Sequence, residues 1–215
     1  MKTILLLIMW ILLVSSLQSK AQTNSSKEMG SILLGPVAGF GNSWVSYIPG
    51  AATFKPSGYV GIGMVNYKTT HWGWGGLAII SSEGYQINYF NNMETVTPVY
   101  LRVPLRAYYF FEGRNSMLRP VLYLGPSFAM KLSEHSTTTN NYRDIYMVGN
   151  SDNFRMFDAG IDAGAGINIK LAKNTWLNMD LGFYEGITDA VRDLPNTYDP
   201  NRDMDLNIGL LFGIR

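Results

Sequence analysis

The sequence contains no cysteine and only two histidines, and this scarcity limits the chemistry available to the chain. Without cysteine there is no disulfide framework, no thiolate metal site and no lipid-modified N-terminal cysteine. Charged residues make up only 15% of the chain, against the ~25% of average soluble domains. Chains that bind nucleic acid or remain disordered are usually far more charged. We therefore expect neither nucleic acid as a partner nor a bound cofactor.

Apolar runs long enough to form a transmembrane helix are also lacking. The run Ile4–Val14 has eleven residues, whereas a helix that crosses a bilayer needs ~20. Lys2 precedes this run and the small-x-small site Ser19-Lys20-Ala21 follows it, which is typical of a secretory signal peptide. We predict a signal peptide over residues 1–21, cleaved after Ala21, and a short periplasmic segment over residues 22–30. The alternative is a buried N-terminal helix.

Removal of the signal peptide leaves a nearly neutral chain. Two of the 17 basic residues are lost and none of the 16 acidic ones, so that the net charge changes from +1 to −1. No partner attracted by charge alone is expected from this balance.

The remaining chain alternates apolar and polar residues with a period of two, the pattern of strands that have two different faces. Leu122 and Leu124, for example, alternate with residues of the face that carries Arg119 and Lys131. In the five most regular segments the apolar face contains no charged residue. Gly75-Gly76 is expected to form a bulge that shifts the phase. We predict eight strands, at residues 32–41, 59–67, 72–81, 99–111, 118–132, 157–171, 177–184 and 204–215.

The connections between these strands are alternately long and short. Three short turns are expected at residues 68–71, 112–116 and 172–175. Between them lie four long loops, a contrast that places all long connections at one end of the sheet. Outer-membrane barrels have this asymmetry, with long extracellular loops and short periplasmic turns. The expected long loops are residues 42–57, 82–97, 133–153 and 188–202.

Eight alternating strands also fit a secreted, lipocalin-like barrel whose apolar residues line a ligand cavity. The polar face favours the membrane barrel, because it mixes glycines such as Gly164 and Gly182 with large polar residues, which suits a crowded interior. Trp72 and Tyr109 lie near the expected periplasmic rim, where aromatic girdles occur. We therefore predict an all-β, eight-stranded antiparallel up-and-down transmembrane β-barrel over residues 31–215, with a polar lumen filled by side chains.

The charged residues of the polar face separate by sign along the chain. Bases lie on the fourth and fifth strands and acids lie on the last three, with Lys170 and Arg215 as exceptions. Across a narrow lumen such charges can pair, as Arg106 with Asp162. We interpret them as a structural cluster that plugs the lumen, and a path for protons or ions is the alternative. The cluster consists of Arg102, Arg106, Arg119, Lys131, Asp158, Asp162, Asp180 and Asp205.

Several motifs resemble those of the PorT-like outer-membrane β-barrel family. Leu101–Leu105, followed by Tyr108–Phe110, looks like its Ile/Val-Pro-Leu…Tyr-Phe strand. Tyr123–Pro126 resembles its Gly-Pro strand, Phe157–Gly166 its Asp-x-Gly…Gly-x-Gly strand, and Tyr184–Asp189 its Tyr-x-Gly-Leu-Thr-Asn turn. The resemblance covers residues 31–215. It implies a small barrel in the outer membrane, with a few relatives serving protein secretion and most having no assigned activity.

Two features depart from a regular barrel of this family. Family members usually end on an aromatic residue, whereas this chain ends Phe212-Gly213-Ile214-Arg215. We expect the barrel assembly machinery to be a partner, with a recognition signal that is either weaker than usual or read from Phe212. Pro104, Pro120 and Pro126 lie inside predicted strands, where each removes a ladder donor, so either bulges or lumen water that meets the freed carbonyls are expected there.

Catalytic and metal-binding patterns are weak. His135-Ser136 superficially suggests an esterase dyad, but both residues lie in a polar loop without an oxyanion motif. The acidic residues of the last long loop do not match the spacing of a calcium loop; they are Asp189, Asp193, Asp199 and Asp203. We therefore expect a non-enzymatic protein without catalytic, cofactor or metal sites.

The long loops contain eight aromatic residues that fit either a recognition surface or packing on the barrel rim. They are Trp44, Tyr47, Phe54, Tyr85, Tyr89, Phe90, Tyr142 and Tyr146. We expect a structural or interaction role through these loops, with outer-membrane lipid and a protein as partners. The alternatives are an accessory component of a protein secretion apparatus or a narrow channel, and less favourably the secreted ligand-binding barrel.

Overall fold

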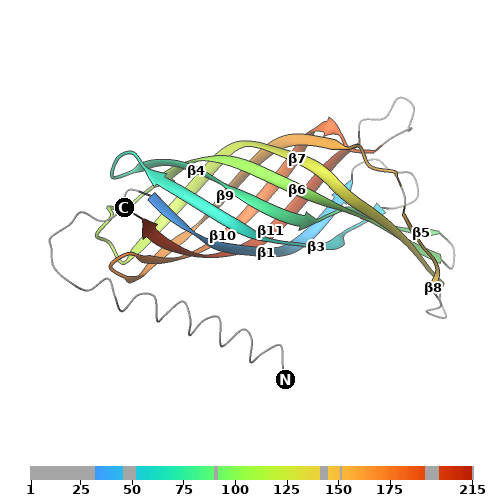
Figure 1. Ribbon diagram of the computed structural model, residues 1–215, viewed down its shortest axis with the longest axis horizontal. Helices are drawn as coiled ribbons and strands as arrows, with labels where there is room; N and C mark the ends of the chain where they lie inside the picture. Colours follow the sequence, from blue (N-terminus) through green and yellow to red (C-terminus); the bar gives the residue numbers. More distant parts are fainter. Residues whose placement is uncertain are drawn as a thin grey trace, which may run out of the picture.

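The computed structural model describes residues 32–45, 52–89, 92–140, 145–150, 152–191 and 199–214. The predicted signal peptide and the segment 22–30 lie outside these residues, as do Tyr47, Phe90, Tyr142 and Asp193. Every element of the described residues is a strand (Figure 1). The strands are β1 Ile32–Val45, β2 Ala52–Thr53, β3 Lys55–Tyr67, β4 Trp72–Ser82, β5 Tyr85–Tyr89, β6 Asn92–Phe110, β7 Leu118–Asn140, β8 Ile145–Asn150, β9 Phe157–Ala172, β10 Thr175–Asp189 and β11 Pro200–Ile214.

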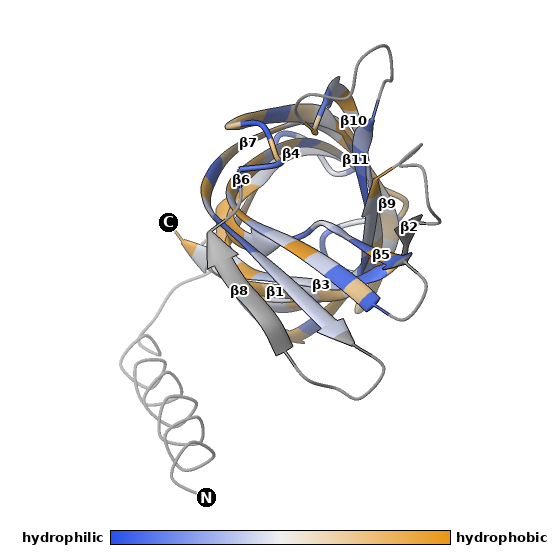
Figure 2. Cartoon of the chain, turned by 90° about the vertical axis from the view of Figure 1, so that its right-hand side faces the viewer, coloured by the Kyte–Doolittle hydropathy of each residue, from blue (hydrophilic) through white to orange (hydrophobic). Residues whose placement is uncertain are grey.

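Eight of these strands close into a ring by antiparallel pairing. The order β6-β4-β3-β1-β11-β10-β9-β7 is completed by the pairing of β6 with β7. The first and last strands of the ring are neighbours, with Ile32 opposite Ile214. Figure 2 looks along this ring from the end that carries β5 and β8. The prediction of an eight-stranded up-and-down barrel is confirmed. Among the described residues no helix is long and apolar enough to span a membrane.

The apolar faces of the strands point outward and the polar faces point into the barrel. Leu124 and Ile161 are 59% and 46% exposed, whereas the inward-facing Arg106 and Asp162 are each only 6% exposed. The alternation of blue and orange along the strands in Figure 2 reflects these two faces. A soluble barrel with an apolar ligand cavity requires the opposite orientation, so that alternative is wrong.

Three of the four predicted long loops, residues 42–57, 82–97 and 133–153, are in large part strands. β6 and β7 have 19 and 23 residues, about twice the ~9–11 that cross a membrane. β5 continues the line of β4 along β6, because Ser82 faces Val99 and Tyr85 faces Val96 in one unbroken register. β8 pairs with the end of β7. We call the sheet formed by β2, β5, the first part of β6, the last part of β7 and β8 the extension; β5 and β8 mark it in Figure 1.

The bulge predicted at Gly75-Gly76 is absent. β4 keeps one register with β3 through these glycines, from Trp74 opposite Asn66 to Leu77 opposite Gly63. The apolar pattern of the sequence changes phase here because Leu77 and Ile79 are apolar residues that face the lumen, where both are buried.

The three strand prolines cause no register shift either. Pro120 and Pro126 face Ile167 and Ile161 on β9, and Pro104 faces Ser127 on β7. The expected bulges at these residues are therefore wrong, and the one shift between β6 and β7 lies at Val99/Tyr100. The β6–β7 ladder instead skips Leu105 and Arg106 next to the proline-bearing stretch.

Arginine placed at an outward position in the middle of the barrel wall tests the orientation of the faces. We expect Leu122→Arg and Ile161→Arg each to lower the free energy of unfolding by about 2–4 kcal/mol, because the charge enters the hydrocarbon layer. The measurement is urea unfolding of the protein in lipid vesicles. Phe157→Arg, at the end of the same strand as Ile161, is the control, with an expected loss of about 0–1 kcal/mol near the interface. Equal losses at all three positions would contradict the orientation.

Candidate functional site

The lumen is closed at the short-turn end by an aromatic layer. Arg119 is fully buried within it, its guanidinium carbon 4.3 Å from the ring centroid of Phe110 and 4.9 Å from that of Tyr67. Its Nε donates to the Glu112 carbonyl (3.0 Å) and its Nη2 to the Thr70 carbonyl (3.1 Å), which ties two turns together. Arg119 therefore belongs to this layer rather than to the central charges. The layer comprises Leu33, Val65, Tyr67, Tyr108, Phe110, Val121, Tyr123, Trp176 and Leu211.

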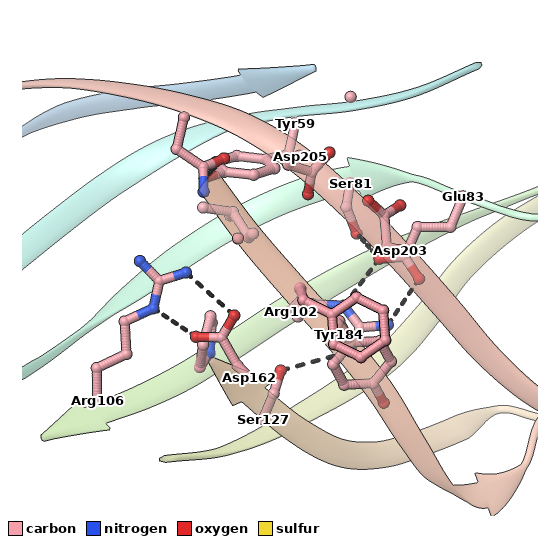
Figure 3. A pocket seen from close by; sticks show the side chains of 16 residues that line it. Tyr59, Ser81, Glu83, Arg102, Arg106, Ser127, Asp162, Tyr184, Asp203 and Asp205 are labelled. Atoms are coloured by element: carbon pink, nitrogen blue, oxygen red, sulfur yellow. Dashed lines mark hydrogen bonds and ion pairs between the residues drawn. The ribbon is translucent and has the colours of Figure 1, made fainter. Parts of the chain in front are cut away.

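Arg106 and Asp162 form a two-point ion pair in the middle of the lumen. Arg106 Nε donates to Asp162 Oδ2 at 2.5 Å and Nη2 donates to Oδ1 at 3.2 Å (Figure 3). The guanidinium also lies 4.0 Å from the ring centroid of Tyr123. β6 and β9 are not neighbours in the sheet, because β7 lies between them, so this pair reaches past a strand through the interior. The structure thus brings together the two residues whose signs suggested a pair.

Asp180 is held by hydrogen bonds instead of a cation. Its Oδ1 accepts from the hydroxyl of Tyr123 (2.7 Å) and from Nδ2 of Asn207 (2.8 Å). Asn207 in turn accepts from the Tyr59 hydroxyl at 2.6 Å. Neighbouring Asp205 is only partly buried and accepts from Ser57 Oγ at 3.4 Å. Two of the predicted cluster residues therefore lie in the lumen without a direct arginine partner.

Arg102 forms a second ion-pair group nearer the long-connection end. It donates to both oxygens of Glu83 (2.8 and 2.7 Å) and to Asp158 Oδ2 (2.8 Å). Its guanidinium lies 3.9 Å from the ring centroid of Tyr184, whose hydroxyl also donates to Asp158. The side chains of Arg102 and Asp158 are both buried, with 6% and 1% of their surface exposed. Buried charges of this kind are tolerable because each is paired and hydrogen-bonded.

Glu83 is the central lumen residue that the sequence interpretation missed. It accepts from Ser81 Oγ (2.6 Å) and from Nδ2 of Asn201 in addition to Arg102. The sequence signal for this residue was the alternation of inward-facing positions 77, 79, 81 and 83. It was overlooked because residues 82–97 were assigned to a loop. Gly84 follows with φ +124°, and a Cβ there would lie 2.1 Å from the Val96 carbonyl oxygen. Only glycine fits at this point, where β4 passes into β5.

Lys131 lies apart from the other predicted lumen residues, at the base of the extension. Its Nζ donates to Glu134 (2.7 Å), to Asp152 (2.9 Å) and to the Phe154 carbonyl. Glu134 also accepts from the Phe154 amide at 3.0 Å. Phe154 belongs to an apolar layer that covers the lumen at this end. Lys131 therefore stabilises this layer and does not pair with the charges of the interior. That layer contains Val45, Tyr85, Ile87, Val96, Tyr100, Ala129, Phe154, Ala190 and Val191.

A cavity of about 30 Å³ remains between the two ion-pair groups. This volume is large enough for one or two water molecules, given ~10–15 Å³ for each. The charged residues that line it include Asp203 and Asp205 of β11 as well as Arg102 and Arg106 of β6 (Figure 3). Asp203 Oδ1 is buried without a hydrogen-bond partner in the described residues, which is consistent with a water molecule there. The interior is therefore a packed polar core rather than an aqueous pore.

The residues that superficially suggested catalysis or metal binding are not assembled into a site. His135 pairs opposite Thr97 and is exposed, whereas Ser136 projects from the other face of β7 and donates to Glu94 (3.2 Å). Asp189 pairs with Arg155 at 2.9 Å. Within the segments that the structure describes, no three acidic or histidine side chains are grouped to hold a metal ion.

Three of the loop aromatics, Trp44, Phe54 and Tyr85, contact other aromatic rings of the protein. Trp44 and Phe54 are in edge contact on the outer surface, with ring centroids 4.9 Å apart, and Trp44 also approaches Phe183. Tyr85 is buried against Phe154, 5.6 Å between centroids. These contacts fit packing on the barrel rim, and Phe54, which is 63% exposed, also remains accessible to a partner.

A double-mutant cycle on Arg106 and Asp162 tests the central ion pair. Because each single alanine variant leaves a buried charge without its partner, we expect each to lose about 3–5 kcal/mol of unfolding free energy. The double variant loses less than the sum, with a coupling of about 1–3 kcal/mol. The half-exposed outer pair Glu185–Arg202 is the control, with a coupling of about 0–1 kcal/mol. A coupling near zero for Arg106 and Asp162 would remove this pair from the account.

Solved structures that resemble the chain share little sequence with it. The outer membrane protein OprG from Pseudomonas aeruginosa is 13% identical over 87% of this chain and 98% of its own, with a TM-score of 0.50. Neisserial surface protein A is 13% identical, with coverages of 87% and 100% and a TM-score of 0.47. Ail, the attachment invasion locus protein of Yersinia pestis, is 11% identical, with coverages of 86% and 100% and a TM-score of 0.44. At these identities the likeness concerns the fold alone.

The sequence itself identifies the family. A search of curated proteins finds no significant match. A family model described as "Outer membrane protein beta-barrel domain", however, matches residues 20–192, which is most of the chain. The chain therefore belongs to this family of outer membrane β-barrel proteins, and the outer membrane is where its barrel resides.

Proposed function

We propose that the protein is a non-enzymatic membrane anchor that binds a protein partner outside the cell through the extension. In outer-membrane barrels the long connections are extracellular and the short turns periplasmic, which places the extension outside the cell. The observation that carries the proposal is the length of β6 and β7, 19 and 23 residues. Only about half of each strand is needed to cross the membrane.

The extension is a built structure rather than a set of loops. Its inner face packs on the apolar layer around Val96 and Phe154, both fully buried. The two hairpins β5–β6 and β7–β8 lie side by side because β6 also pairs with β7 as far as Asn92 opposite Asn140. Such a sheet holds its outer face and edge in a fixed position, which lowers the entropic cost of binding a partner.

The edge strand of the extension offers a mode of binding. Among the described residues β8 pairs only with β7, so its other side has backbone amides and carbonyls available to a strand of a partner. The outward face of the two long strands is polar next to this edge, with Thr95 opposite Thr137 and Thr97 opposite His135. This combination fits an extended protein segment better than a lipid.

The closed lumen supports an interaction role over a narrow channel. The aromatic layer lies at the periplasmic end, the apolar layer lies at the extracellular end, and the cavity between them has a volume of about 30 Å³. An accessory role in protein secretion is compatible with the proposal, since a secretion partner is also a protein.

The remaining parts of the proposal concern export and assembly. The signal peptide of residues 1–21 directs export, and cleavage after Ala21 leaves a short periplasmic segment. The barrel assembly machinery recognises the C-terminal strand, in which Phe212 faces Thr175 of β10. Membership of the PorT-like branch rests on the motif resemblance and remains part of the proposal.

Photocrosslinking in intact cells, combined with conductance measurements, tests this function. With a photoreactive amino acid at Thr137, we expect a protein adduct that is lost when Met147→Pro is added, because proline removes a donor and disturbs the edge strand. A photoreactive residue at Leu122, in the membrane, is the control and gives no such adduct. We expect the purified protein in a planar bilayer to show no stepwise ion conductance, because the lumen is closed at both ends. Stepwise conductance without any adduct at Thr137 would overturn the proposal in favour of a channel.

A further inference from the structure

The lipid-facing wall of the barrel contains an apolar hollow of about 710 Å³. This volume lies within the ~300–1,000 Å³ of small-molecule sites. The small side chains of Ala107, Ala163 and Ala165 contribute to its surface, together with larger residues such as Leu124 and Phe183. The hollow is therefore a groove between bulky side chains on a surface that otherwise faces lipid tails.

The sheet register explains the direction of the groove. One hydrogen-bonded row joins Tyr109 and Leu122 to Ala165 and Leu181. The next row passes through Ala107, Leu124, Ala163 and Phe183 to Met204. The groove thus crosses the wall obliquely from the periplasmic end of β4 to the start of β11, as the rows of a tilted barrel do.

The periplasmic end of the groove lies beside an available cation. Trp72 and Tyr109, which line this end, are in edge contact with centroids 5.0 Å apart. The backbone amide of Lys68 donates to the Trp72 carbonyl (3.0 Å), and Lys68 Nζ lies 5.9 Å from the ring centroid of Trp74. Lys68 is exposed, and among the described residues it has no acidic partner. Lysine next to interfacial tryptophan is placed at the level of lipid headgroups.

The extracellular end of the groove has no comparable charge. The nearest cation along β11 is Arg202, two residues from Met204, and it is already held by Glu185 through contacts of 2.6 and 2.8 Å. An anionic headgroup would compete there with a carboxylate. At the periplasmic end it meets a cation that has no acidic partner among the described residues.

We propose that this groove binds an anionic glycerophospholipid of the periplasmic leaflet, with an acyl chain against the alanines and the phosphate at Lys68. The apolar wall matches the chain, and the exposed lysine matches the phosphate. A second copy of the barrel or an apolar helix of another protein would require no charge at the end of the groove.

Native mass spectrometry of the purified protein in mild detergent tests the site, with phosphatidylglycerol added as the probe. We expect one retained lipid per chain. Ala165→Phe fills the groove and reduces this occupancy at least tenfold, and Lys68→Ala weakens binding roughly fivefold, as ~1 kcal/mol per lysine near an anionic surface implies. The matched controls are Ala159→Phe, on the same strand outside the groove, and Lys173→Ala, on another periplasmic turn. All four positions are on the outside, and heat-modifiable gel mobility verifies that each variant is folded.

Three results would overturn the proposal. The first is the absence of retained phosphatidylglycerol. The second is an equal loss of bound phosphatidylglycerol in Ala165→Phe and Ala159→Phe, which would mean that the lipid is held unspecifically on the surface. The third is that Ala165→Phe abolishes a dimer, or the binding of another protein, while the binding of lipid is unchanged in this variant. Equal retention of phosphatidylethanolamine and phosphatidylglycerol would contradict the role of Lys68 in headgroup choice. None of these results depends on the extension, so the site and the proposed function fail independently.

Discussion

The buried ion pairs of Arg102 and Arg106 are the interaction on which the rest of the structure depends. An eight-stranded barrel has an interior just wide enough for side chains, so the inward positions must fill and neutralise that space themselves. Both arginines meet Asp158 or Asp162 across an intervening strand, and each also stacks on a tyrosine. Because charges are satisfied inside, the outward faces are free to be wholly apolar over the membrane-crossing part of the wall.

This constraint divides the lumen into layers and moves function to the surface. Arg119 and its aromatic neighbours close the short-turn end, and Phe154 with its apolar neighbours covers the other. Only a water-sized cavity remains between the two arginines. What the barrel can offer to other molecules is therefore its outer wall, its turns and the extension. The proposed protein-binding edge and the proposed lipid groove occupy two of these surfaces.

The barrel and its central pair could be predicted because period-two alternation encodes strand faces directly. The apolar side chain of Leu122 and the charged side chain of Arg106 each indicate which face of the strand the residue belongs to. The extension could not be predicted, because the threonine-rich stretch from Ser133 to Asn140 lacks the apolar alternation of a membrane strand. This stretch nevertheless pairs with β6 throughout. Glu83 was missed because residues 82–97 were assigned to a loop, although the alternation of inward positions continues through Leu77, Ile79 and Ser81 to Glu83. Arg119 was grouped with the central charges because sequence gives the side of a strand but not the level along the barrel, which depends on tilt and register.

The most direct measurement of the account exploits the absence of cysteine, which allows a single fluorescent label at any chosen position. With the label on Leu124→Cys and the barrel in vesicles, we predict strong quenching by lipids brominated on their acyl chains and little quenching by aqueous iodide. A label on Thr137→Cys, in the extension, should show the reverse. Quenching of the Leu124→Cys label by iodide rather than by brominated lipid would contradict the outward orientation of the apolar faces, and with it the account of the polar lumen.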